Sequence, residues 1–168
     1  MKRILFAALT AAALFSDGIL QSLNAQNMEI PKKVSPFPVG DKLPEQFSKY
    51  FIGQAWLAPL TDDKRLNAPV SNVTFSPGCR NNWHIHHAQK GGGQMLICVY
   101  GRGWVQLEGE PAHELKAGEV FNIPPNVKHW HGAAKDSWFQ HLSLEVPGEG
   151  TSNEWLEPVT DEVYDKLP

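Results

Sequence analysis

From residue 53 onward, the chain consists of short apolar or alternating runs that are separated by turn-forming residues. An apolar residue at every second position indicates a strand with one buried face, and the interruptions carry Gly, Pro and Asn combinations typical of turns. The predicted strands are residues 54–58, 72–76, 82–86, 94–100, 103–108, 112–115, 120–123, 129–133 and 139–145. Nine short strands at this spacing predict an all-β protein, either a sandwich or a barrel.

Less regular segments flank the predicted strands on both sides. Residues 26–52 contain four prolines and many polar residues, which predicts an irregular N-terminal arm with one helical turn at residues 45–50. In the C-terminal tail, residues 148–168, Thr160 is the predicted N-cap of a short helix. We therefore expect one barrel domain over residues 53–147, between the arm and the tail.

The first 25 residues have the features of an export signal. Lys2 and Arg3 form a basic start, the apolar run of residues 4–15 is too short to span a bilayer, and a cleavage site follows Ala25. We predict that residues 1–25 are removed and that the mature chain is periplasmic or secreted, without a membrane anchor. A core helix or a retained anchor is the alternative for this segment.

The composition fits one globular domain and excludes some partners. The chain has 168 residues, 42% of them hydrophobic and 20% charged, and Gly and Pro are frequent, as in turn-rich β proteins. A net charge of −3 gives no electrostatic reason to expect a nucleic-acid partner. Cys79 and Cys98 are the only cysteines, and the sequence leaves open whether they form a disulfide or remain two buried thiols.

All seven histidines lie between His84 and His141. Strand alternation places several polar residues on shared faces: His84 with His86, His129 with His131, His141 with Ser143 and Glu145, and Gln94 with Leu96 and Cys98. If these faces point into a barrel, a divalent metal would satisfy several buried imidazole nitrogens at once. The alternatives are core histidines with individual partners, or histidine pairs that face solvent.

The spacing of these residues resembles the two sequence motifs of the cupin family. Gly78 is followed after five residues by His84-Ile85-His86, Gln94 is followed after six by Gly101, and Gly118 is followed after five by Pro124 and then by His129. The resemblance covers about residues 53–147. It implies a double-stranded β-helix, or jelly-roll barrel, with a metal inside.

Three segments carry a closer resemblance, residues 73–84, 123–134 and 155–162. They are similar to small bacterial cupins related to carboxymuconolactone-decarboxylase-linked cupins and to cupin-type hydroxynitrile lyases. The resemblance implies a metal, often manganese, held by His84, His86, Gln94 and His129, with Gln89 on the preceding loop as a rival to Gln94. Mn(II) is favoured, and imidazole and amide donors also suit Fe(II), Ni(II) or Zn(II).

Other inward residues are candidates for catalysis or for the pocket wall. His131 and His141 match further inward histidines of the lyases, and we expect them to titrate near neutral pH and to act as general acid or base. Glu145 stands where such a lyase has Gln, and it would either take part in proton transfer or orient a histidine. Val73 and Phe75 are expected to line the pocket.

Four further residues are predicted to take no part in the chemistry. His87 and His113 are expected on a loop and a hairpin, in contact with solvent. Trp83 and Trp130 alternate with the ligand candidates along the chain, so they are expected on the outer side of the barrel. There they would serve core packing or a homodimer interface.

Three functions remain open at the level of sequence. The first is a metal-dependent lyase that acts on a small hydroxy or carbonyl compound through Lewis-acid chemistry. The second is a metal-dependent dioxygenase, which would consume oxygen. The third is a non-catalytic cupin that binds a small molecule or a metal, because the fold alone does not decide the function.

Overall fold

The computed structural model describes residues 35–61, 65 and 67–168. The predicted export signal and the first part of the arm, residues 26–34, lie outside the described residues. In the described part of the chain, no helix has the length and apolar character needed to cross a membrane.

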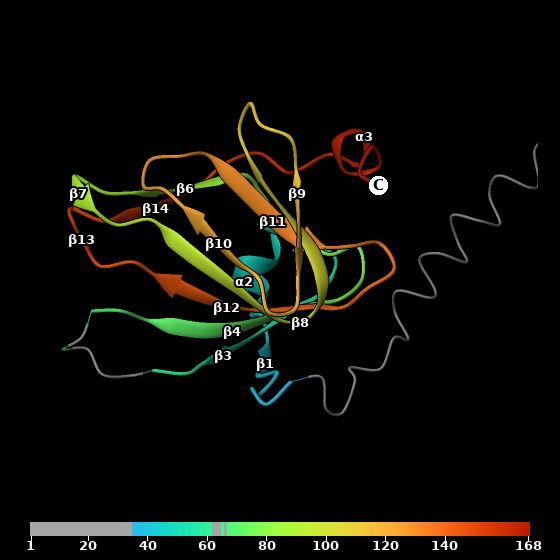
Figure 1. The fold of residues 1–168 in the computed structure, drawn as a ribbon, viewed down its shortest axis with the longest axis horizontal. Helices are drawn as coiled ribbons and strands as arrows, with labels where there is room; N and C mark the ends of the chain where they lie inside the picture. Colours follow the sequence, from blue (N-terminus) through green and yellow to red (C-terminus); the bar gives the residue numbers. More distant parts are fainter. Residues whose placement is uncertain (1–34, 62–64, 66) are drawn as a thin grey trace, which may run out of the picture. The chain divides into compact units, whose positions relative to one another are not determined.

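The described chain is mostly β-strand, as the alternation predicted (Figure 1). The elements are β1 Asp41–Lys42, α2 Glu45–Ser48, β2 Phe51–Ile52, β3 Ala55–Pro59, β4 Val70–Phe75, β5 Arg80–Asn81, β6 His84–His87, β7 Lys90–Gly91, β8 Gln94–Leu107, β9 His113–Lys116, β10 Val120–Ile123, β11 His129–Ala133, β12 Phe139–Glu145, β13 Gly148–Glu149, β14 Ser152–Trp155 and α3 Asp161–Tyr164. All strand pairs are antiparallel. The all-β barrel prediction is confirmed.

The long strand β8 joins the two walls of the barrel. Its first half pairs with β10 and β12, and its second half pairs with β9 and β11. The prediction of two separate strands, 94–100 and 103–108, was wrong because Gly101 bends the strand without ending it. Gly101 has a φ of 69°, which glycine adopts readily, and it still pairs with Phe139 of β12.

Apolar side chains fill the barrel interior next to the histidines. Phe75, Leu96, Val105, Leu115 and Phe139 are fully buried in this core. Cys79 and Cys98 also belong to it, and both are free thiols, so the disulfide option is not realised in the structure. Burial raises the pKa of both thiols, that of Cys98 to about 11, which keeps them protonated and unreactive at neutral pH.

A second cluster lies on the outer side of the barrel, where the tail packs against it. Trp130 is fully buried there with Trp104, Val159 and Tyr164, and Trp83 is partly buried against them. Trp83 and Trp130 therefore pack outside the barrel as predicted, and within one chain they cover the tail helix. Thr160 stands at the N-cap of α3, but its side chain makes no capping hydrogen bond.

The arm and the tail both add strands that the sequence did not predict. In the arm, β1 pairs with β3, and β2 pairs with β5. In the tail, β14 pairs with the histidine strand β6, and β13 forms a small ribbon with β7. These strands have two to four residues, which is too short for an alternation to be visible.

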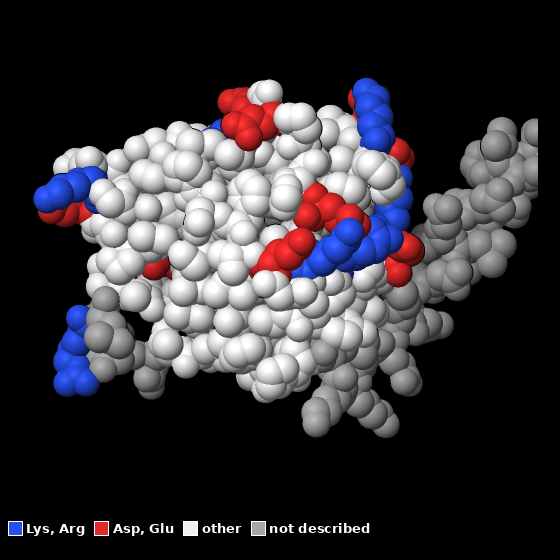
Figure 2. Space-filling view, in the orientation of Figure 1, with Lys and Arg blue, Asp and Glu red and all other residues white. Residues whose placement is uncertain are grey.

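Charged side chains are unevenly spread over the face of the molecule seen in Figure 2. Charged groups lie at the left and upper edges of this face, and a further group in its right half contains acidic and basic side chains close together. Most of the face in front of β8, β12 and β4 is uncharged. No continuous basic surface is visible on this face.

Candidate metal centre

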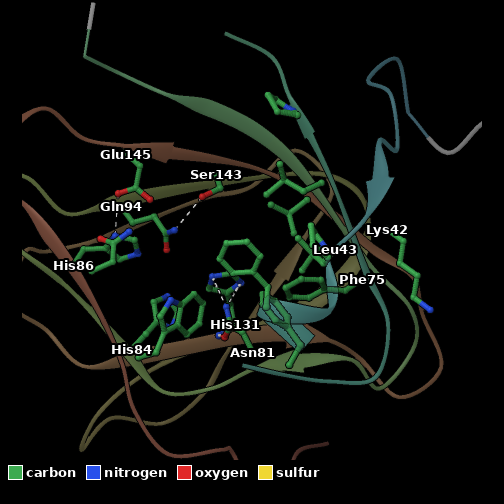
Figure 3. Close-up of a pocket in the computed structure, with 18 of the residues that line it drawn as sticks. Lys42, Leu43, Phe75, Asn81, His84, His86, Gln94, His131, Ser143 and Glu145 are labelled. Carbon is green, nitrogen blue, oxygen red and sulfur yellow. Dashed lines mark hydrogen bonds and ion pairs between the residues drawn. The ribbon is translucent and has the colours of Figure 1, made fainter. Parts of the chain in front are cut away.

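Two pairs of neighbouring strands carry the predicted site residues. His84 and His86 alternate along β6, and His129 on β11 lies directly opposite His84. On the other wall, Gln94 of β8 pairs with Glu145 of β12. Figure 3 shows His84, His86, Gln94 and Glu145 around one end of the barrel interior.

Three histidines form a compact cluster of donor atoms. One nitrogen from each of His84, His86 and His129 lies within 4.8 Å of the others, and all three side chains are buried. The ring centroids are 4.1 Å apart for His84 and His129, and 5.4 Å for His86 and His129. Such a group could hold one metal ion.

Each of these rings has an oxygen next to its Nδ1 atom. His84 Nδ1 donates to the Asn82 carbonyl at 2.9 Å, and His129 Nδ1 donates to the Val127 carbonyl at 2.8 Å. His86 Nδ1 lies 2.9 Å from a Glu145 carboxylate oxygen, although the two are not aligned for a hydrogen bond. A proton on Nδ1 leaves the Nε2 lone pair free to bind a metal.

Burial keeps the imidazoles of His84 and His129 neutral, which is the form that binds metals. Burial, together with the charge of neighbouring histidines, lowers the pKa of His84 well below 6.5 and the pKa of His129 to about 4. A neutral ring retains the lone pair that ligation requires.

Buried nitrogen and oxygen atoms that lack a hydrogen-bond partner indicate whether these residues fit a metal ion. Among the described residues, His86 Nε2, His129 Nε2 and Gln94 Oε1 are buried and lack a hydrogen-bond partner. Each such unpaired atom costs about 1–3 kcal/mol of folding free energy. Three of them in one cluster therefore indicate a ligand that they share. Two imidazole nitrogens and an amide oxygen are suitable donors for a divalent cation.

Gln94 is better placed than its rival Gln89. Its amide nitrogen donates to Ser143 Oγ at 3.0 Å, which turns the unpaired oxygen away from Ser143. Gln94 also lines the same pocket as His84 and His86. Gln89, by contrast, is exposed, and its side chain lies beside Gly150.

His131 and His141 occupy different places, although both are buried. His131 lines the pocket and is held by Asn81, whereas His141 is not among the pocket-lining residues and packs between Phe139 and Phe75. Burial lowers the pKa of His131 well below 6.5 and that of His141 to about 3. The expectation that both titrate near neutral pH was wrong, because strand alternation does not reveal how completely each ring is desolvated.

The pocket above the histidines is mostly apolar and has a volume of about 510 Å³. Val73 and Phe75 line it as predicted. The sequence did not predict the residues that the arm and tail contribute: Asp41, Lys42, Leu43, Pro44, Phe47, Phe51, Asn153 and Trp155. Trp155 is stacked 4.8 Å from His84 on one side and 4.7 Å from Tyr50 on the other, so it links arm, tail and metal cluster.

The two histidines expected to be incidental lie outside this pocket. His87 points away from the cluster and its Nε2 lies 2.7 Å from a carboxylate oxygen of Glu154. His113 is exposed on β9 beside Phe121.

Known proteins share this fold and much of the sequence. The cupin domain family model matches residues 71–143. The (R)-mandelonitrile lyase of Granulicella tundricola is 41% identical over 117 residues, 68% of this chain and 86% of that protein.

Solved structures agree with this relationship. A cupin-like protein from Thermotoga maritima is 40% identical, with a TM-score of 0.68 over 78% of this chain and 95% of its own. A cupin-2 domain protein from Rhodospirillum rubrum, 17% identical with a TM-score of 0.59 over 83% of this chain and 88% of its own, shares the fold. With its barrel, its motif spacing and its close relative in agreement, the chain belongs to the cupin family.

Proposed function

We propose that this chain is a metal-dependent lyase that cleaves a cyanohydrin of an aromatic aldehyde. The observation that carries the proposal is the group of unpartnered donors on His86, His129 and Gln94 beside an aromatic pocket. The relative named (R)-mandelonitrile lyase supports this class of substrate. Phe47, Phe51 and Phe75 line the pocket with aromatic rings, against which the aryl group of a substrate can pack.

In this proposal His84, His86, His129 and Gln94 hold the metal, with Mn(II) as the favoured ion. All four donors are neutral, so the bound cation keeps its full charge and supplies a Lewis acid for a hydroxyl or carbonyl oxygen. Trp155 stacks on His84, and Ser143 and Glu145 lie against Gln94 and His86. These contacts would hold the ligand side chains in place.

The reaction needs one proton acceptor and one proton donor beside the substrate. In cyanohydrin cleavage the hydroxyl loses its proton and the carbonyl bond forms. The bond to the nitrile carbon breaks with its electron pair, and cyanide takes up the proton that the acceptor has received from the hydroxyl. Among the titratable groups of the pocket wall, Glu145 lies against the ligand candidate His86, and His131 is buried in the same wall. We choose these two for the transfer over Asp41 and Lys42 of the arm. We assign acceptance of the hydroxyl proton to Glu145, whose carboxylate is partly exposed to the pocket.

Export and assembly remain proposals. The basic and apolar start of the chain supports cleavage after Ala25 and a periplasmic or secreted location. A homodimer is supported by the uncharged face in front of β8 and β12. Half-buried Met95, Ile97 and Leu142 lie on these strands at positions that alternate with the core residues.

The test uses the mature chain from Gln26, purified without added metal and then loaded with Mn(II). We expect bound metal, release of benzaldehyde from (R)-mandelonitrile, and no oxygen consumption. The Glu145→Gln variant should retain metal and lose about 100-fold or more in kcat, the scale of a lost proton acceptor. Glu149→Gln, an exposed carboxylate on β13, is the matched control and should keep full activity.

Other outcomes would decide against the proposal. Oxygen uptake with a substrate would favour the dioxygenase alternative. Protein that binds metal and an aromatic ligand without turnover would favour the non-catalytic alternative.

A further inference from the structure

Asn81 contacts His131 through both the oxygen and the nitrogen of its side-chain amide, which the spacing along the chain did not predict. Asn81 lies on the short strand β5 and is buried at the pocket wall. Its Oδ1 accepts a hydrogen bond from the backbone N–H of His131 at 2.9 Å, and its Nδ2 lies 2.9 Å from Nε2 of the same residue. Figure 3 shows the Asn81 amide directed at the His131 ring.

The first contact fixes which way the amide points. A backbone N–H can only donate, so the Asn81 atom that faces it must be the oxygen. The amide nitrogen must then be the atom that faces the imidazole. The orientation of Asn81 therefore follows from its own hydrogen bonds.

The second contact fixes where the proton of His131 lies. An amide NH₂ group can only donate, so the ring nitrogen beside it must present a lone pair. Both ring nitrogens lie within hydrogen-bond distance of Asn81 Nδ2, at 2.9 Å for Nε2 and 3.4 Å for Nδ1, and the shorter contact identifies Nε2 as the acceptor. A neutral imidazole carries one proton, which must then reside on Nδ1. In a doubly protonated ring, the Nε2–H of His131 would point at an N–H of the Asn81 amide.

Neighbouring rings restrict any rearrangement of His131. Phe75 stacks parallel to it with centroids 5.7 Å apart, and His141 meets it edge-on at 4.9 Å. His131 is only 4% exposed. A rotation of the imidazole that frees Nε2 would have to displace these packed rings.

We propose that Asn81 is a positioning residue that holds His131 as the neutral tautomer with its proton on Nδ1. His131 then has one N–H and no free lone pair, so any hydrogen bond that it makes in the pocket is a donated one, and proton acceptance is left to Glu145. The tautomer assignment stands on the contacts alone. Its consequence for catalysis rests on the proposed function.

The direct test is nitrogen NMR of the full mature chain labelled with ¹⁵N-histidine, loaded with zinc as a diamagnetic ion. Long-range proton–nitrogen correlations distinguish the two neutral tautomers and the doubly protonated ring at one neutral pH. The His131 signals are assigned by their loss in His131→Gln. We expect the proton on Nδ1 in the unmodified chain, and a proton on Nε2, or on both nitrogens, overturns the proposal.

Substitutions at Asn81 show whether this residue sets the tautomer. Asn81→Asp replaces the donor by an acceptor and should move the His131 proton to Nε2. Asn81→Ala removes both contacts and should give a mixture. Asn72→Ala is the matched control, because Asn72 is fully buried but donates to the Pro38 carbonyl and does not line the pocket. Its His131 spectrum should be unchanged.

Kinetic measurements separately test the consequence of the His131 tautomer for catalysis. With (R)-mandelonitrile, Asn81→Ala should lower kcat at least 10-fold and change KM less than 3-fold, with unchanged metal content. A shifted tautomer with unchanged kcat would overturn the donor role of His131. Absence of any cleavage by the unmodified chain would reject the proposed function and leave the NMR result standing. If Asn81→Asp fails to fold, Asn81→Ala and the spectrum of the unmodified chain still decide which nitrogen of His131 carries the proton.

Discussion

At the scale of single residues, burial and local partners assign different roles to chemically identical side chains. His84, His86 and His129 have an oxygen at Nδ1 and direct their other nitrogen into a common cluster. His131 is held by Asn81. In the described part of the chain, His141 has no hydrogen-bond partner for either nitrogen and packs among aromatic rings. The pattern of histidines predicted the cluster, but the separate partner of each ring could not be inferred from spacing.

The buried ring of His141 predicts an acid-sensitive stability. Burial lowers its pKa from 6.5 to about 3, and His131 is the titratable group packed against it. Between these two pH values the unfolded chain binds a proton that the folded chain excludes. The contribution of the neutral His141 ring to the free energy of unfolding is therefore complete above pH 6.5. It is lost as the pH falls, by up to about 1.4 kcal/mol per pH unit.

His141→Gln removes this titration while retaining a polar side chain. Denaturant unfolding of the metal-free chain, measured from pH 7 to pH 4, should show a shallower loss of unfolding free energy in the variant. Parallel curves for the two proteins would contradict the prediction.

At the scale of elements, the two walls of the barrel depend on the continuity of β8. The strand passes from one wall to the other between Gly101 and Gly103, and both glycines are in close contact with neighbouring backbone. A turn was predicted here because Gly-Arg-Gly is typical of turns. The backbone ladder with β12 and β11 continues across these residues, and only the tertiary pairing reveals that.

Replacing Gly101 by alanine should be far more destabilising than replacing Gly118. Both have a positive φ, which costs an alanine about 1–2 kcal/mol. At Gly101 the new Cβ would also lie 1.8 Å from the Trp138 carbonyl oxygen, whereas at Gly118 no atom lies within 4 Å. Thermal unfolding of both variants compares the two costs. Equal losses of Tm would show that the Trp138 contact does not matter.

At the scale of the whole molecule, segments distant in sequence close the pocket. The arm contributes Phe47 and Phe51, the tail contributes Trp155, and the barrel contributes the histidine cluster. Arg80 fastens the tail, because its Nε donates to the Val159 carbonyl at 2.9 Å and it pairs with Asp161. The chain thus encloses a site that neither the barrel nor its extensions would form alone.

Metal binding should stabilise the whole fold, because the ligands come from β6, β8 and β11. At a free metal concentration 100 times the Kd, the expected gain is about 2.7 kcal/mol. Thermal unfolding with Mn(II) and with a chelator measures it. His84→Ala and Gln94→Leu should each reduce the metal-dependent shift in Tm, and a full shift in both would contradict the assigned ligands.

The sequence alone determined the strand pattern, the barrel and the concentration of histidines at one site. These features depend on side-chain alternation and on fixed spacings within motifs, which are local properties of the chain. The tertiary structure decided which residues wall the pocket, which histidines face it, and which polar atoms lie beside each ring. Those properties depend on burial and on partners such as Asn81 and Trp155. Only folding brings them beside the histidines, from short strands that have no detectable alternation of their own.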